Sequence, residues 1–212
     1  MLKIEKFVVN PLQENSYVVS DTTGQCIFID PGFYFTEEKD EVINYVNANS
    51  LTPVMIANTH CHIDHILGVE FIRNSYNIPF VAHPDDAFWI ANSAEQGEMF
   101  GIDMEHVKAP DSYFQENGKL EFGNSSFHII HVPGHSPGHV VFYSDTDQLL
   151  IAGDVLFYGS IGRTDLPGGD HQSLITNIRS KLFKLPDETK VFCGHGPETT
   201  LGDEKQANPF LT

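Results

Sequence analysis

One short segment, residues 60–65 (HCHIDH), constrains this chain more than any other because it places four metal-ligand side chains within six positions. Imidazole nitrogens and carboxylate oxygens are standard ligands for zinc and similar divalent metals. A strand would alternate these side chains between two faces, and a regular helix would separate positions i and i+2. The segment follows the apolar run 53–57, so we predict a tight loop at a strand end, folded around metal rather than a merely His-rich polar loop.

Three more ligand-type residues occur further along the chain, each close behind an apolar run and next to glycine. They are His135 after residues 127–132, Asp154 after residues 149–152 and His195 after residues 190–193. Strands that end at one edge of a sheet bring such side chains into one cleft, and the glycines permit sharp turns and close backbone approach. These residues complete a set of seven ligands, which is enough for two metal ions.

The seven ligands divide into two groups of three and one bridge: His60, His62 and His135; Asp64, His65 and His195; and Asp154. A carboxylate has two oxygens, so Asp154 can reach both ions, which lie roughly 3.5–4 Å apart in two-metal hydrolytic sites. We expect two divalent ions, zinc first, with iron and manganese as alternatives. A hydroxide between the ions would be the nucleophile, Asp64 would orient it, and the residual positive charge would favour an anionic substrate.

Length and composition favour one globular domain over residues 1–212, since 41% of the residues are hydrophobic. Acidic residues outnumber basic ones 29 to 12, which argues against nucleic-acid binding and docking on anionic membranes. No apolar run approaches the roughly 18 residues of a membrane span. The charged residues 1–6 do not suit a signal peptide, and the three cysteines match no zinc-ribbon or redox spacing. We therefore expect a cytoplasmic protein with a small-molecule substrate and no obligate protein partner.

The order of elements predicted from hydrophobic periodicity indicates an α+β fold. Strand-like runs cover residues 3–9, 15–20, 25–29, 53–57, 79–82, 119–122, 127–132, 140–143, 149–152 and 190–193. Helical spacing covers residues 37–49, 68–77, 85–100, 172–185 and 203–207, with Thr36 placed to cap the first helix. Two sheets packed face to face with helices outside satisfy this order.

The ligand motifs resemble the signature of the metallo-β-lactamase superfamily, and the resemblance extends from Lys3 to the end of the chain. It implies a four-layer αββα sandwich with the metals at one edge of the sheets. Asp30 matches the family's early strand-terminal aspartate, which orients the histidine loop from behind the ligands. His139, close to His135, is either a similar supporting residue or an ordinary histidine.

Within the superfamily, residues 153–170 and 194–200 are similar to short bacterial glyoxalase II-like hydrolases. That resemblance implies hydrolysis of thioesters such as S-lactoylglutathione, whose thiolate leaving group needs little help from a general acid. Arg163 stands where larger glyoxalase II enzymes place a substrate-contacting lysine, and it either meets a substrate carboxylate or forms a structural salt bridge. The helical domain that carries glutathione contacts in those enzymes has no counterpart here, which leaves recognition of glutathione open.

The alternative function is a persulfide dioxygenase, an oxidoreductase that the chain also resembles. That family uses one iron ion, which His60, His135 and Asp154 would hold here. The complete second ligand group, including His195 between two glycines, favours the dinuclear hydrolase.

Overall fold

The computed structural model describes residues 1–115 and 118–212 of the chain. The first sheet has the strand order β1-β2-β3-β4-β5-β6, with the bounds Lys3–Val9, Glu14–Ser20, Gln25–Ile29, Thr52–Ala57, Phe80–Ala82 and Ser112–Tyr113. The second sheet has the order β14-β13-β10-β9-β8-β7, with the bounds Thr199–Thr200, Lys190–Cys193, Leu149–Gly153, Val140–Ser144, Ser125–His131 and Lys119–Phe122. A small hairpin pairs β11 (Leu156–Phe157) with β12 (Ser160–Ile161).

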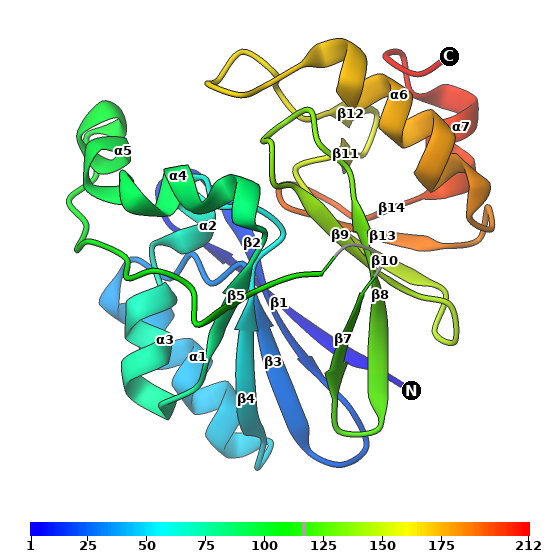
Figure 1. Ribbon diagram of the computed structural model, residues 1–212. Helices are drawn as coiled ribbons and strands as arrows, with labels where there is room; N and C mark the ends of the chain where they lie inside the picture. The colour runs from blue at the N-terminus through cyan, green and yellow to red at the C-terminus, as the bar shows by residue number, and fades with distance from the viewer. Residues whose placement is uncertain (116–117) are drawn as a thin grey trace.

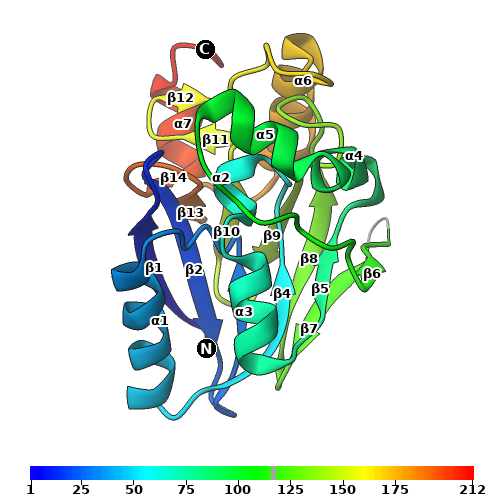
Figure 2. The same ribbon diagram turned by 90° about the vertical axis from the view of Figure 1, so that its left-hand side faces the viewer.

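Helices cover the outer face of each sheet, as Figures 1 and 2 show. Those on the side of the first sheet are α1 (Thr36–Ala48), α2 (Ile63–Ile66), α3 (Val69–Tyr76), α4 (Ala87–Ala91) and α5 (Ser93–Phe100). Those on the side of the second sheet are α6 (His171–Lys181) and α7 (Leu201–Ala207). The predicted α+β sandwich of four αββα layers is confirmed. In the described ranges, no helix has the length and apolar character needed to cross a bilayer.

The central strands explain why four layers form, because their alternate side chains enter different cores. On β3, Cys26 and Phe28 pack toward the helices, whereas Ile27 and Ile29 pack between the sheets. The same alternation on β9 and β10 separates the core between the sheets from the core under α6 and α7. Strands buried on both faces read as continuous apolar runs, which is the pattern seen in the sequence.

Two local predictions differ from the structure. Thr36 does not cap α1: Phe35 is the N-cap, and the carboxylate of Glu38 accepts hydrogen bonds from the backbone amides of Tyr34 and Phe35 at 2.8 and 3.0 Å. The weakly helical stretch 85–100 is not one helix, because the chain turns at Asn92 between α4 and α5. This break gives the α4–α5 segment a bent course across the upper end of the sandwich in Figure 2.

Candidate metal centre

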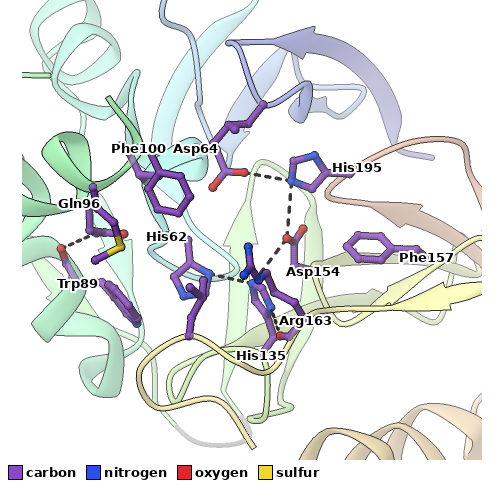
Figure 3. Close-up of a pocket in the computed structure, with 14 residues that line it drawn as sticks. His62, Asp64, Trp89, Gln96, Phe100, His135, Asp154, Phe157, Arg163 and His195 are labelled. Carbon is purple, nitrogen blue, oxygen red and sulfur yellow. Dashed lines mark hydrogen bonds and ion pairs between the residues drawn. The ribbon is translucent and has the colours of Figure 1, made fainter. Parts of the chain in front are cut away.

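The seven predicted ligands meet at one edge of the sandwich. Five of them line a cavity of about 320 Å³ (Figure 3): His62, Asp64, His135, Asp154 and His195. They lie on segments that follow β4, β8, β10 and β13, so strand ends from both sheets contribute. Residues 58–62 leave β4 as a loop, but Asp64 and His65 then lie on the single helical turn α2 rather than in the loop that the sequence predicted. The side-chain amide of Asn58 holds this path by donating to the carbonyls of His60 and His65 at 3.2 and 2.7 Å.

The first ligand cluster consists of His60, His62 and His135, all of which are buried. Nε2 of His135 lies 3.2 Å from Nε2 of His60 and 2.8 Å from Nδ1 of His62. Burial lowers the pKa of each imidazole, that of His62 to about 3, so all three are neutral near pH 7. Neutral imidazoles whose nitrogens converge are the form in which histidine binds metal.

The second ligand cluster consists of Asp64, His65 and His195. Asp64 comes from the side of the first sheet and His195 from that of the second, and their side chains are in contact. Oδ2 of Asp64 lies 3.1 Å from Nε2 of His195 and 3.8 Å from Nε2 of His65. Burial alone would lower the pKa of His65, but Asp64 and Asp154 raise it well above its ordinary value. Burial would likewise lower the pKa of His195, but the hydrogen bond to Asp64 raises this pKa above its ordinary value.

Asp154 lies between the two clusters. Its Oδ2 is 3.6 Å from Nε2 of both His135 and His195, and its Oδ1 is 3.4 Å from Nε2 of His65. Burial would raise the pKa of this carboxyl, but the surrounding histidines, His65 first among them, together hold the pKa far below its usual range. A β-carbon at Gly194 would collide with Oδ1 of Asp154, so glycine there is what lets the carboxylate approach both clusters.

Hydrogen bonds behind the clusters orient three of the ligand histidines, His65, His135 and His195, with Nε2 facing inward. Nδ1 of His135 donates to the carbonyl of Arg163 at 2.7 Å, and Nδ1 of His195 donates to the carbonyl of Gln13 at 3.1 Å. Nδ1 of His65 donates to Oδ2 of Asp30 at 3.0 Å. In each case the hydrogen bond leaves Nε2 free to bind a cation, which is the arrangement typical of metal-binding histidines.

Asp30 holds the histidine loop, and of the two roles that the sequence left open for His139, its contacts indicate the supporting one. Asp30 accepts hydrogen bonds from the backbone amide and the hydroxyl of Thr59, both at 2.6 Å, and so holds the start of the histidine loop. Nε2 of His139 accepts a hydrogen bond from the backbone amide of Asp154 at 3.0 Å, while its ring stacks on His60 with 4.6 Å between centroids. His139 thus links the bridging residue to the first cluster.

The donor set fits divalent metal ions. Nε2 of His65 and Oδ1 of Asp154 are buried 3.4 Å apart, and neither has a hydrogen-bond partner among the described residues. Unpaired buried polar atoms are costly, and a cation coordinated by both would remove that cost. His60, His62 and His135 would hold one ion, Asp64, His65 and His195 the other, and Asp154 would contact both.

Two supporting residues escaped the sequence reasoning. Asp86 accepts hydrogen bonds from the amides of Cys61 and Gly138 at 2.9 and 2.6 Å, so it ties the loop of the first two histidines to the loop after His135. Glu14 is fully buried beside His65, 3.7 Å from its Nδ1. Neither residue has ligand spacing. The signal available was an acidic residue next to apolar sequence, which is too common to indicate a site.

Arg163 lines the cavity, but its guanidinium forms a two-pronged ion pair with Asp165 on the same loop, with both N–O distances 2.7 Å. The pair is exposed to solvent. Of the two roles that the sequence left open, the structure therefore shows the salt bridge, and substrate contact stays a prediction.

Comparison with known proteins identifies the class defined by this fold and donor set. Residues 9–195 match the model of the metallo-β-lactamase superfamily, and the chain belongs to that superfamily. It is 39% identical to the probable metallo-hydrolase YqgX of Bacillus subtilis, over 99% of this chain and 98% of the relative. It is 34% identical to the hydroxyacylglutathione hydrolase GloC of Haemophilus influenzae, with the same shares covered.

Solved structures show the same similarity. The crystal structure of the B3 metallo-β-lactamase BLEG-1 superposes with a TM-score of 0.91 at 37% identity, and each chain is covered completely. The structure of TTHA1623 in a di-iron-bound form superposes with a TM-score of 0.87 at 38% identity, over 98% of this chain and all of the other. Together with the His and Asp clusters, these relatives establish a metallo-hydrolase of the superfamily.

Proposed function

We propose that this metallo-hydrolase binds two divalent ions and cleaves thioesters of the S-lactoylglutathione type. The observation that carries the proposal is the pair of complete ligand clusters joined by Asp154 at the floor of one cavity. The similarity to GloC, which is named a hydroxyacylglutathione hydrolase, supports the substrate class. Zinc, iron and manganese all suit His and carboxylate ligands, and the di-iron form of TTHA1623 supports iron alongside zinc.

Bound dications would act as Lewis acids and lower the pKa of a coordinated water to about 7. The protein's own side chains would orient the attacking water. Asp64 lines the cavity, and although burial opposes ionisation, His65 and His195 together lower its pKa. The carboxylate is therefore ionised and can accept a hydrogen bond from the attacking water. A thiolate, with an ordinary pKa of about 8.5, leaves without a general acid, whereas an amide nitrogen needs one.

Arg163 is the residue proposed to meet an anionic substrate. A substrate carboxylate can replace Asp165 in the same two-pronged geometry, because an ion pair this exposed to solvent is weak. The excess of acidic residues supports a small-molecule substrate over nucleic acid or a membrane surface. Three free, buried cysteines are compatible with the proposed cytoplasmic location.

The test is elemental analysis of the purified protein followed by a thioester panel that includes S-lactoylglutathione. We expect two metal ions per chain and hydrolysis at neutral pH. Asp154→Ala is expected to lose both metal and turnover. The proposal fails if the metal-loaded protein cleaves no thioester on the panel, or if Asp154→Ala keeps its metals and its rate.

The persulfide dioxygenase alternative requires one iron ion on His60, His135 and Asp154. The inward-facing His195 and Asp64, 3.1 Å apart, have no role in a mononuclear site and therefore favour the hydrolase. Oxygen uptake with glutathione persulfide, measured on the same metal-analysed sample, separates the two functions. A β-lactam included in the panel tests the activity named for BLEG-1.

A further inference from the structure

One side of the cavity beside the metal ligands is apolar. We call the three apolar side chains that α4 and α5 contribute there, Trp89, Met99 and Phe100, the α4–α5 wall. The indole of Trp89 packs edge-on against the ring of His62, with 4.7 Å between centroids, so the wall begins directly at the first cluster. Figure 3 shows Trp89 and Phe100 on one side of His62, with Phe157 and His195 across the cavity.

The wall is anchored to the metal loop. The buried side-chain amide of Gln96 donates to the carbonyl of Cys61 at 3.3 Å and to the carbonyl of Trp89 at 2.8 Å. The hydroxyl of Ser93 accepts a hydrogen bond from the amide of Val107 at 3.0 Å, which secures the segment that leaves the wall. These contacts fix the wall next to the ligands, so its position relative to the reacting atoms is set by the fold.

Two members of the wall are nevertheless exposed, Met99 by 65% and Phe100 by 39%. Large apolar side chains gathered at the mouth of a ligand cavity are typical of binding sites, because a ligand covers the apolar surface that water would otherwise contact. The cavity thus offers an apolar surface close to the place where a scissile carbonyl would lie.

The positively charged side chains that line the cavity are too few to recognise both carboxylates of a glutathione carrier. Among the described residues that line it, Arg163 is the only lysine or arginine, and Asp165 already neutralises it. A glutathione carrier brings two carboxylates, for which the lining offers at most this one cation. The proposed metal ions would attract a carboxylate of any carrier alike, so the selectivity of the cavity must come mainly from its apolar contacts.

We propose that the α4–α5 wall binds an apolar acyl group of the thioester, so that the enzyme prefers alkyl or aromatic acyl thioesters to the small, hydroxylated lactoyl group. This specificity rests on the proposed thioester hydrolysis. The thiol carrier is held weakly, and the acyl group sets the selectivity. Burial of each additional methylene on the wall is expected to strengthen binding roughly two- to four-fold.

Binding can be measured without catalysis because Trp89 is the only tryptophan in the sequence. Its fluorescence in the metal-loaded protein is titrated with non-hydrolysable S-alkyl thioethers of N-acetylcysteamine, from methyl to hexyl. We expect the emission of Trp89 to change and Kd to fall about 30-fold or more across the series. A Kd that does not depend on chain length, or no binding of the hexyl thioether, overturns the proposal.

Variants of the exposed wall residues locate the effect without disturbing the core. Met99→Ser with Phe100→Ser is expected to abolish most of the chain-length dependence, and Phe100→Leu is expected to keep it. Phe210→Ser is the matched control, since Phe210 is 48% exposed and does not line the cavity. Retained dependence in the double variant, or equal loss in the control, contradicts the assignment to the wall.

The catalytic series separates this proposal from the one on which it rests. S-acetyl-, S-butanoyl-, S-hexanoyl- and S-lactoylglutathione are compared by kcat/KM with one carrier throughout. Hydrolysis of all four at equal kcat/KM supports the thioester hydrolase and overturns the acyl specificity. Chain-dependent binding of the thioethers with no hydrolysis of any thioester supports the apolar site and overturns the proposed function.

Discussion

The two ligand clusters share one cavity floor but differ in charge and in exposure. The first contains three buried imidazoles, and burial keeps them neutral. The second contains Asp64, the buried His65 and the partly exposed His195. Asp64 and the bridging Asp154 raise the pKa of both histidines. The first cluster therefore presents lone pairs to a cation at neutral pH, whereas the second must release protons before it can bind one.

This contrast suggests different roles for the two clusters in the proposed mechanism. In the first cluster only Asp154 would offset the charge of a bound metal, which would suit the polarisation of a carbonyl oxygen. In the second cluster Asp64 would offset a further part of the charge, and it lies where it can orient water. Asp154 belongs equally to both clusters, so variants of it and of each cluster are expected to have effects of different size.

Asp154→Asn is expected to have the largest effect. The amide keeps the shape of the side chain but loses the negative charge that both clusters share, so metal content should fall from two ions to one or none. We expect kcat/KM for a thioester to fall at least roughly 1,000-fold, since several kcal/mol of transition-state stabilisation depend on the metals. Elemental analysis and kinetics on the same sample check this. Full metal content with nearly normal activity would show that Asp154 does not bridge the clusters.

Substitution of one histidine in each cluster tests whether each cluster holds its own metal ion. His195→Ala is expected to remove the second metal, keep the first, and lower thioester hydrolysis about 100- to 1,000-fold. His62→Ala is expected to lose the metal of the first cluster instead. Metal stoichiometry and spectra of cobalt-substituted protein distinguish the two losses. Unchanged hydrolysis in His195→Ala would count against a dinuclear mechanism and would mean that the first cluster alone suffices for hydrolysis.

Asp30→Asn is expected to weaken metal binding at the second cluster more than at the first, because Asp30 supports a ligand of the second cluster. The variant replaces the charged acceptor of Nδ1 of His65 and of the hydroxyl of Thr59 with a neutral amide. Residues that orient metal ligands typically contribute 10- to 100-fold in metal affinity. We expect a loss of that size at the second cluster and a smaller one at the first, measured by competition with a chelator. Equal losses at both clusters would mean that Asp30 mainly supports the histidine loop as a whole.

The sequence predicted the ligand residues and the layered fold because both follow from patterns with physical causes. Continuous apolar runs mark strands buried on two faces, and a glycine followed by a ligand marks a strand end at the sheet edge. The turn of α2 was missed because four residues are too few to show helical periodicity. Its formation depends instead on Asn58, whose side chain holds the carbonyls of His60 and His65.

The supporting residues could not be predicted because their roles depend on contacts between distant parts of the chain. Asp86 meets Cys61, 25 positions away, and Gly138, 52 positions away. Helical spacing does not show which side of a bent segment faces a cavity, so the sequence could not place the α4–α5 wall. The arrangement of α4 and α5 in the fold brings Trp89 against His62 and places Phe100 at the same cavity.

Asp86 supports the first cluster in the way that Asp30 supports the second, and it gives the smallest of the expected effects, one on stability rather than on the chemical step. Burial raises the pKa of its carboxyl from 3.8 to about 6, although three hydrogen bonds oppose this shift. The folded protein therefore binds this proton more tightly than the unfolded chain. The group contributes stability that is fully present below pH 3.8 and is lost as the pH rises through 6.

A shift of this size corresponds to about 3 kcal/mol of unfolding free energy between pH 7 and pH 3.8. Asp86→Asn cannot titrate, so the metal-free variant is expected to lack this gain on acidification. Urea unfolding at pH 7, 6, 5 and 4 checks it, with chelator present so that metal release does not contribute. The free energy of unfolding of the parent minus that of the variant should increase as the pH falls. A constant difference would mean that Asp86 is ionised at all four pH values and acts only as a hydrogen-bond acceptor that joins the two loops of the first cluster.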